Sequence, residues 1–542
     1  MGPLGRTIRL WHTVRHLKPV QFWGRARFRL ARPVPDLRPA PARRAVAGTW
    51  VTPAARRASM TGPTTLLLLN EPHDVAQVGW DEASLAKLWR YNAHYFDDLC
   101  AQGAASRSAW HRALLERWMR ANPPAAGTGW EPYPTSLRIV NWVKWAMAGN
   151  DLPAGFADSL AVQARWLAQR LEWHLLGNHL FVNAKALVFA GLFFEGPEAD
   201  GWLALGARIL RDQVPEQVLS DGGQFERSPM YHALALEDML DLANVLRAFG
   251  RADDAWRALV DARIPAMRRW LQAMCHPDGE ISFFNDAAIG VAPAPAELDA
   301  YARRLGEPAL QPPADGITLL ADSGYVRMQL GRAVVIADVG PVGPDYLPGH
   351  AHADTLSFEL SLDGRRVLVN SGTDRYGLGA ERLRQRGTAA HTTVTVDGQD
   401  SSEVWGGFRV ARRAGVTVPV VSGAPDALRV SCSHDGYRRL PGAPVHRRAW
   451  TLTPTGLEVA DELTGPGQAV AHWHWAPGNH PAAGGAPAVE LADGGTLRID
   501  CGGAPWASQP GTWHPEFGRI EPNFRSDCPY PGRSHTVRLI WS

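Results

Sequence analysis

Two histidines, His350 and His352, lie immediately before a segment whose residues alternate as in a β-strand. Apolar and polar residues alternate through residues 356–362, and Asp363-Gly364 is typical of a tight turn. Side chains two positions apart on an extended chain point to the same face. One imidazole could therefore exchange protons while the other binds a metal or orients its neighbour.

A tyrosine lies at a second position suited to proton transfer. Ser228 can cap a helix that begins at Pro229, which places Tyr231 in its first turn. The positive end of the helix dipole, helped by Arg227 or His232, would favour the phenolate and lower a pKa that is ordinarily about 10. Tyr231 is therefore a candidate proton shuttle.

A third cluster, residues 177–187, also opens a predicted helix, and Asn178 is placed to cap it. Taken alone, each of these helix starts is better explained by a cap beside a packed ring.

The elements that must position these residues belong to two parts of the chain, the first with a helical sequence pattern and the second with a strand-like one. Helical periodicity extends from about residue 82 to residue 304, with long segments at 159–176, 183–194, 229–249 and 255–274. Successive amphipathic helices without intervening strands predict an all-α domain of stacked hairpins over residues 64–312.

Short β-rich segments follow, separated by Gly, Pro and Asp-Gly turns, and they predict an antiparallel β-sandwich over residues 313–542. The change from the helical to the strand-like pattern falls near residues 310–317. The expected strands are 324–330, 333–339, 356–362, 367–369, 392–396, 416–421, 447–452, 457–459 and 537–541.

Composition excludes several classes of protein. The chain has 542 residues, which exceeds one hydrophobic core, and its formal net charge of +2 gives no argument for nucleic acid binding. Five widely spaced cysteines indicate neither a disulfide framework nor a thiolate zinc site. The 22 tryptophans could stack on sugar rings or fill the core.

The N-terminal 63 residues form a basic extension and a linker. Residues 1–32 mix basic and aromatic side chains, and residues 32–63 are rich in Pro, Ala and Arg. We see no signal peptide and no apolar run of membrane-spanning length. The extension could touch a membrane or a partner, but packing on its own domain is the simpler interpretation.

Taken together, the motifs resemble those of the heparinase II/III-like polysaccharide lyases and the alginate lyases of the same fold. The resemblance covers roughly residues 80–540 in the same order. The matching segments are 89–97 (WRYNAHYFD), 130–142 (WEPYPTSLRIVNW), 177–180 (GNHL), 225–232 (FERSPMYH), 350–354 (HAHAD) and 370–373 (NSGT), with His391. The resemblance implies a multidomain α+β protein, in which an incomplete α/α toroid precedes an antiparallel β-sandwich and the active cleft lies between them.

The implied chemistry is β-elimination at a uronic acid, which requires neutralising the substrate carboxylate and stabilising the enolate that forms when the C5 proton leaves. By resemblance, Asn178 or His179 neutralises the carboxylate, Tyr231 is the base, the acid or both, and His350 is its partner. Arginines could hold acidic groups through paired contacts. The substrate-binding residues expected from the resemblance are Trp130, Tyr133, Arg138, Asn141, Arg227 and His232.

No cofactor is expected to be required for catalysis, but the resemblance implies a possible structural zinc or other divalent ion. The matching positions are His352, Asn370 and His391, and Asn370 departs from the expected aspartate. Because an amide oxygen is a poorer zinc ligand, either Asp354 or Asp374 takes its place or the site is a metal-free hydrogen-bond network.

Two other classes of function stay open. A glycoside hydrolase on an α/α scaffold would need paired carboxylates, for which Glu226, Asp286 and Glu131 are available. A non-catalytic glycan-binding or polysaccharide-assembly protein could keep the fold without turnover.

The sequence does not name the anionic polysaccharide partner, which could be a heparan-type glycosaminoglycan, alginate or a bacterial exopolysaccharide. It also leaves the mode of attack and the oligomeric state open. Without a visible signal peptide the sequence predicts the cytoplasm, whereas the family resemblance indicates the periplasm or cell envelope.

Overall fold

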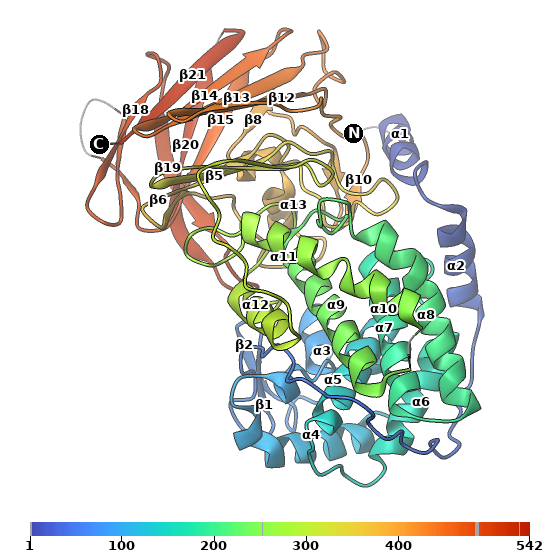
Figure 1. The fold of residues 1–542 in the computed structure, drawn as a ribbon. Helices are drawn as coiled ribbons and strands as arrows, with labels where there is room; N and C mark the ends of the chain where they lie inside the picture. Colours follow the sequence, from blue (N-terminus) through green and yellow to red (C-terminus); the bar gives the residue numbers. More distant parts are fainter. Residues whose placement is uncertain (1–2, 252, 483–486, 531, 542) are drawn as a thin grey trace.

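The computed structural model describes the whole chain except residues 1–2, 252, 483–486, 531 and 542. A helical domain comes first along the chain and a domain of antiparallel sheets follows, and the two lie one above the other (Figure 1). None of the described helices is long and apolar enough to cross a bilayer.

The helical domain is built around α7 (Gly177–Phe193), which is apolar on nearly every side and is therefore buried. It packs against α5, α6, α8 and α9. The other helices of this domain are α3 (Lys87–Ala93), α4 (Ser108–Ala121), α5 (Pro132–Met147), α6 (Phe156–Gln169), α8 (Pro197–Gln217), α9 (Pro229–Phe249), α10 (Asp254–Asp261), α11 (Ile264–Ala273) and α12 (Pro295–Arg304), with short 3-10 turns η1 (Asp97–Cys100), η2 (Ala104–Arg107) and η3 (Thr128–Trp130).

Local signals explain where these helices agree with the sequence prediction. The predicted helix 229–249 is confirmed, because Ser228 caps it and Gly250 ends it in the left-handed conformation. The predicted helix 255–274 is wrong as one element. It is two helices, α10 and α11, and Pro265 takes the first turn of α11, where its missing N–H costs nothing.

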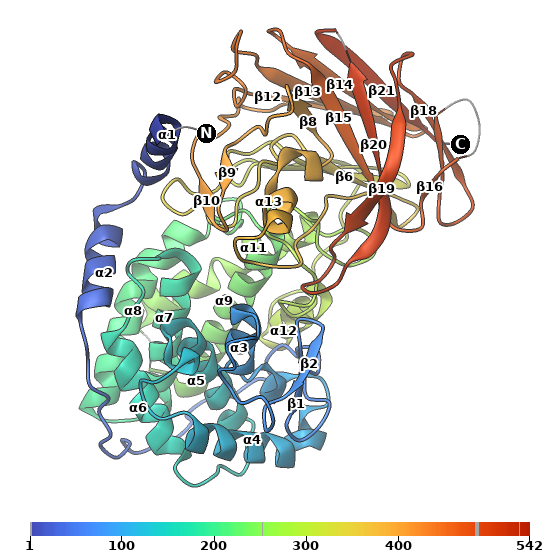
Figure 2. The same ribbon diagram turned by 180° about the vertical axis from the view of Figure 1, so that it is seen from behind.

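The N-terminal residues form a strap along the edge of the molecule. Helices α1 (Pro3–Val14) and α2 (Pro19–Leu30) run beside both domains, as Figures 1 and 2 show from opposite sides. The segment that follows packs on the helical domain through backbone hydrogen bonds to Phe193 and Ala248. A hairpin of β1 (Thr65–Leu68) and β2 (Glu71–Asp74) then begins the body of that domain.

Two antiparallel sheets form the C-terminal domain. One has the order β11-β12-β13-β14-β21-β18-β17-β16, and the other β19-β20-β15-β7-β6-β5-β4-β3 with β8 also paired to β15. Their buried faces enclose an apolar core that includes Trp450, Trp473 and Trp475. A separate small sheet pairs β9 (Val404–Trp405) with β10 (Arg409–Val410).

The remaining bounds of this domain are β3 (Gly316–Leu320), β4 (Tyr325–Leu330), β5 (Ala333–Asp338), β6 (Phe358–Leu362), β7 (Arg365–Leu368), α13 (Ala380–Arg386), η4 (Thr388–Ala390), β8 (Val394–Val396), β11 (Val420–Ala424), β12 (Ala427–His434), β13 (His446–Thr453), β14 (Gly456–Leu463), β15 (Ala469–Trp475), β16 (His480–Pro481), β17 (Ala488–Glu490), β18 (Thr496–Asp500), β19 (Ala507–Trp513), β20 (Glu521–Tyr530) and β21 (Ser534–Ile540).

An apolar cluster and Arg227 are among the contacts that join the two domains. Trp270 of α11 packs with Tyr325 and Ile336 of the sheet. Arg227, at φ +61°, donates hydrogen bonds to the carbonyls of Pro341 and Gly343 at 3.0 Å and of Asp322 at 3.3 Å. The helix that begins at Pro229 is therefore anchored to the sandwich.

Candidate active site

His350 is held at the domain junction by a buried carboxylate. It lies in the connection between β5 and β6, and its Nδ1 is 2.9 Å from Oδ2 of Asp286, in the connection between α11 and α12. Asp286 also accepts hydrogen bonds from Arg382 and from His352, whose Nε2 is 2.8 Å from Oδ1. Burial opposes ionisation of Asp286, but Arg382 and the two histidines outweigh it and hold its pKa well below the ordinary range.

This network assigns the tautomer of His350. An ionised Asp286 can only accept, so Nδ1 of His350 carries a proton, and in the neutral imidazole Nε2 is the nitrogen with the free lone pair. Nε2 lies 3.8 Å from Oε2 of Glu226. His350 therefore has the form of a general base with an oriented ring.

Tyr231 packs against that ring, and the two ring planes are tilted by 33°. The two ring centroids are 4.0 Å apart, and the Tyr231 hydroxyl is 3.0 Å from the hydroxyl of Tyr376. As predicted, Ser228 caps the helix by accepting from the backbone N–H of Tyr231 at 3.2 Å. Residues from both domains thus meet at one pair of rings.

The expected lowering of the Tyr231 pKa is wrong. Burial, together with the neighbouring Tyr376 and Tyr133, raises that pKa well above 10. Neither expected helper directs a positive charge at the Tyr231 hydroxyl, because the Arg227 guanidinium is turned to backbone carbonyls and burial lowers the pKa of His232 to about 4. The hydroxyl of Tyr231 is therefore protonated and is poised to donate.

The N-terminus of α7 forms the opposite side of the site. Leu176, not Asn178, occupies the capping position, so the predicted cap is wrong, and Asn178 instead hydrogen-bonds the Tyr133 hydroxyl. The ring of His179 lies 4.5 Å from that of Tyr133, and its Nδ1 is 3.2 Å from Oε2 of Glu172. Burial disfavours the imidazolium, but Glu172 outweighs it and raises the pKa of His179.

Gly177 makes this approach possible. It has a φ of +51°, and a Cβ at this position would lie 2.2 Å from Cδ2 of Leu347 and 3.3 Å from Oε1 of Glu226. Only glycine lets the start of α7 come this close to the loop of the sandwich domain.

Five residues expected to bind substrate do not lie open to the site. Trp130, Arg138, Asn141 and His232 are buried in the helical domain, where each bonds to the protein: Trp130 to the Asn122 carbonyl, Arg138 to Gln163, Asn141 to Asp97 and the Tyr95 carbonyl, and His232 to the Met267 carbonyl. The Arg227 side chain instead bonds backbone carbonyls at the domain interface. Of that set, Tyr133 lies in the site, half-buried.

Three site residues carry no recognisable signal in the sequence. Tyr376 bonds Tyr231, Arg382 pairs with Asp286, and Phe408, 43% exposed, lies edge-on to His350 at 5.9 Å between centroids. They lie in a loop, in the short helix α13 and in the three-residue connection between β9 and β10, where no periodic pattern of apolar residues indicates which way a side chain points.

The carboxylates considered for a hydrolase are not a free pair. Asp286 is fully engaged by Arg382, His350 and His352, and Glu131 bonds Tyr91 and Lys87. Glu226 lies beside His350. The other two carboxylates considered for a hydrolase are already paired, so neither is available as its partner acid. The arrangement does not fit two acids flanking a glycosidic oxygen.

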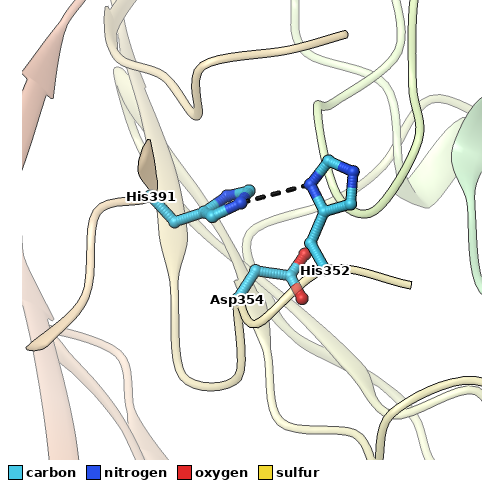
Figure 3. Close-up of side chains that lie close together, drawn as sticks. All are labelled: His352, Asp354 and His391. Atoms are coloured by element: carbon cyan, nitrogen blue, oxygen red, sulfur yellow. Dashed lines mark hydrogen bonds between the residues drawn. The ribbon is translucent and has the colours of Figure 1, made fainter. Parts of the chain in front are cut away.

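His352, Asp354 and His391 form a buried group with metal-ligand chemistry (Figure 3). Their ligand atoms lie within 4.8 Å of one another, and Nδ1 of His352 is 3.2 Å from Nε2 of His391. Burial lowers the pKa of His352 to about 4 and that of His391 to about 3, which keeps the imidazoles neutral, as ligands must be. The donor set fits a divalent ion such as zinc.

Asn370 does not belong to that group. Its amide instead bonds the backbone N–H of Thr392 and the hydroxyl of Ser357. Of the two substitutes considered, Asp354 lies beside the histidines. Asp374 lies with Glu381 and His514, where Arg375 pairs with it.

Comparison with known proteins places this arrangement in a family. The chain matches "Heparinase II/III N-terminus" over residues 112–301 and "Heparinase II/III-like, C-terminal" over residues 312–542. It is 27% identical over 405 residues to "FtsZ-localized protein C" of Caulobacter vibrioides, covering 71% of this chain and 66% of that protein. It is 26% identical over 242 residues to a "Heparin-sulfate lyase" of Bacteroides stercoris, covering 41% of this chain and 36% of the lyase.

Among solved structures, heparinase III superposes with a TM-score of 0.69 at 18% identity, covering 87% of this chain and 80% of that one. This likeness shows the fold, with helices first and antiparallel sheets second. The chain spans between about a third and two thirds of the length of these two curated relatives.

Proposed function

Because the chain belongs to the heparinase II/III-like family, we propose that it is a polysaccharide lyase that cleaves a uronic-acid-containing polymer by β-elimination. The product would carry an unsaturated uronate at its new non-reducing end. The observation that supports this most directly is the packed pair of Tyr231 and His350, which come from different domains.

The pair divides the two proton transfers that elimination needs. Nε2 of His350, whose other nitrogen is bonded to Asp286, is the base that takes the C5 proton. Tyr231 keeps its proton because its pKa is raised, and it donates that proton to the C4 oxygen as the bond breaks. The direction of the Tyr231 pKa thus favours the acid role over the base role.

The substrate carboxylate must be neutralised while charge develops on it. Asn178 offers an amide donor at the start of α7, and His179, whose pKa is raised by Glu172, offers a cation beside it. The positive end of the α7 dipole adds to both. We assign the carboxylate to this side of the site.

Sugar rings would stack on the exposed aromatic side chains around the pair. Phe408 is open to solvent, and Tyr376 lies 5.2 Å from it between centroids. Flat aromatic faces suit the apolar face of a pyranose ring.

We also propose that His352, Asp354 and His391 would hold a structural divalent ion. A bound ion would cross-link the loops that carry these residues, and Asp286 would then bond the outer nitrogen of His352, as is usual for metal-ligating histidines. Purified protein analysed for metal tests this: the content should fall in His352→Ala and His391→Ala and stay unchanged in His350→Ala.

The experiment for the lyase is digestion of a panel of uronic-acid polymers, followed by the ultraviolet absorbance of the C4–C5 double bond. Heparan-type glycosaminoglycan, alginate and a bacterial exopolysaccharide form the panel. A lyase creates the chromophore, a hydrolase releases reducing ends without it, and a binding protein does neither. Tyr231→Phe is the matched control that keeps the ring.

A second candidate is a polysaccharide-binding protein without turnover. It stays a candidate because the similarity to FtsZ-localized protein C, whose name states a location and no lyase activity, extends over more of this chain than the similarity to the B. stercoris lyase. Binding of a panel polymer without the chromophore would support this candidate.

A further inference from the structure

The strap formed by α1 and α2 has an apolar outer face that the fold leaves uncovered. In α2, Phe22, Trp23, Ala26 and Leu30 recur at the spacing of one helix face, and all four are exposed. Phe22 is 55% and Trp23 58% exposed. In α1, Ile8 and Trp11 are exposed in the same way, and Trp11 reaches 62%.

The opposite face of the strap packs against the body of the protein. Gly24 lies against the backbone of Trp173 and His174, and Phe28 packs 4.4 Å from the ring of His174. In α1, Thr13 accepts a hydrogen bond from Trp405 of the sandwich. Docking to the body of the protein therefore does not explain the outer aromatic residues.

The exposed tryptophans are confined to this strap. All 22 tryptophans lie in the described part of the chain, and in that part only Trp11 and Trp23 are classed as exposed. Tryptophan is favoured where an apolar phase meets water, because its ring is apolar and its N–H is polar.

The strap is also strongly cationic. Residues 1–35 contain seven arginines and Lys18 but no Asp or Glu. Among the ion pairs of the described residues, only Lys18 in this segment meets a carboxylate, that of Glu216. Arg25 and Arg29 flank the apolar stripe of α2 on one side and Arg27 on the other.

We propose that the outer face of α1 and α2 binds the surface of a membrane that contains anionic lipids, with both helices lying in the plane of the headgroups. An apolar stripe bordered by arginines is the pattern of an interfacial helix. A second copy of the chain is a poorer occupant, because a symmetric contact would bring two cationic faces together. A polyanionic sugar would satisfy the arginines but gain little from Ile8 and Leu30, whereas lipid acyl chains would cover them.

The test is flotation of the full chain with vesicles of phosphatidylcholine alone or mixed with phosphatidylglycerol. We expect binding to the anionic vesicles, weakened by salt, and little binding to the neutral ones. Replacing Arg25, Arg27 and Arg29 by Gln should lower the partition coefficient about 100-fold. Phe22→Ser with Trp23→Ser should lower it about 10-fold or more.

The control is Val418→Ser with Val420→Ser, which removes exposed apolar side chains from the sandwich and should leave partitioning unchanged. Equal binding of the strap variants and the unmodified chain would overturn the proposal. A dimer seen in sedimentation that dissociates in Trp23→Ser would also overturn it, because the face would then bind a second copy. The same holds if the chain binds a soluble uronate polymer but no vesicles, and the arginine replacements abolish binding of the polymer. These readouts need no lyase activity, so they are independent of the proposed reaction.

Discussion

The two sides of the candidate site are built differently. On the sandwich side, His350 belongs to a buried ionic network in which Asp286 bonds two histidines and Arg382. On the helical side, Asn178 and His179 are half-buried at a helix start and have few partners. In the proposed reaction, the first side is pre-organised for proton transfer and the second is left open for the substrate carboxylate.

The largest expected effect comes from breaking the ionic network. Asp286→Asn leaves the buried Arg382 without its counter-charge, so the free energy of unfolding should fall by about 3 kcal/mol or more. Chemical denaturation measures this. Glu131→Gln, on the half-buried helical side, should cost less than about 1 kcal/mol. Equal costs for the two variants would break the comparison.

Removing the base should affect turnover without unfolding the protein. His350→Ala should lower the rate of elimination by about 1000-fold, because a positioned general base contributes effects of that order. The melting temperature should change little, since the ring lines the site and leaves Arg382 paired with Asp286. Appreciable lyase activity in this variant would return His350 to a structural role.

The next effect separates the two tyrosines. Tyr231→Phe should lower turnover by about 100-fold with substrate binding retained, because only the donated proton is lost. Tyr376→Phe keeps that proton and removes only its 3.0 Å partner, so it should cost about tenfold. The reverse order of rates would assign the acid to Tyr376.

The smallest effect concerns pH on the open side. The pKa of His179 is raised, so its pairing with Glu172 is fully present below about pH 6.5 and is lost as pH rises through the raised value. The difference in melting temperature between the unmodified chain and His179→Gln should therefore be largest at low pH. The stabilisation should stay below about 1 kcal/mol, because the ring is partly solvated. A difference that grows with pH would contradict the assignment.

The sequence predicted elements best where local signals were strong. Helix 229–249 has a serine cap, a first-turn proline and a terminal glycine, all within its own residues. The sandwich was predicted as a class, yet β12, β15 and β20 were not identified, since their polar residues, such as His472 and His474 in β15, are buried by tertiary bonds that no local pattern reveals.

Part of the site was predictable from motifs in the sequence. Asn178, His179 and Tyr231 lie at helix starts, and His350 lies in the histidine pair that precedes the strand β6. Arg138 and Asn141 lie in the middle of α5, and which face of that helix turns inward depends on the packing of α6 and α7. Tyr376 and Arg382 depend on loop conformation, which one sequence does not indicate.

Arg227 ties the start of α9 to the sandwich domain through both its side chain and its backbone. Its side chain is bonded to three carbonyls of the sandwich domain, and its own carbonyl accepts from Tyr325 at 2.6 Å and from Asn285 at 2.9 Å. These bonds fix the backbone that leads into Tyr231 to the domain that carries His350. The relative position of the two rings is therefore set in part by bonds that lie outside the site.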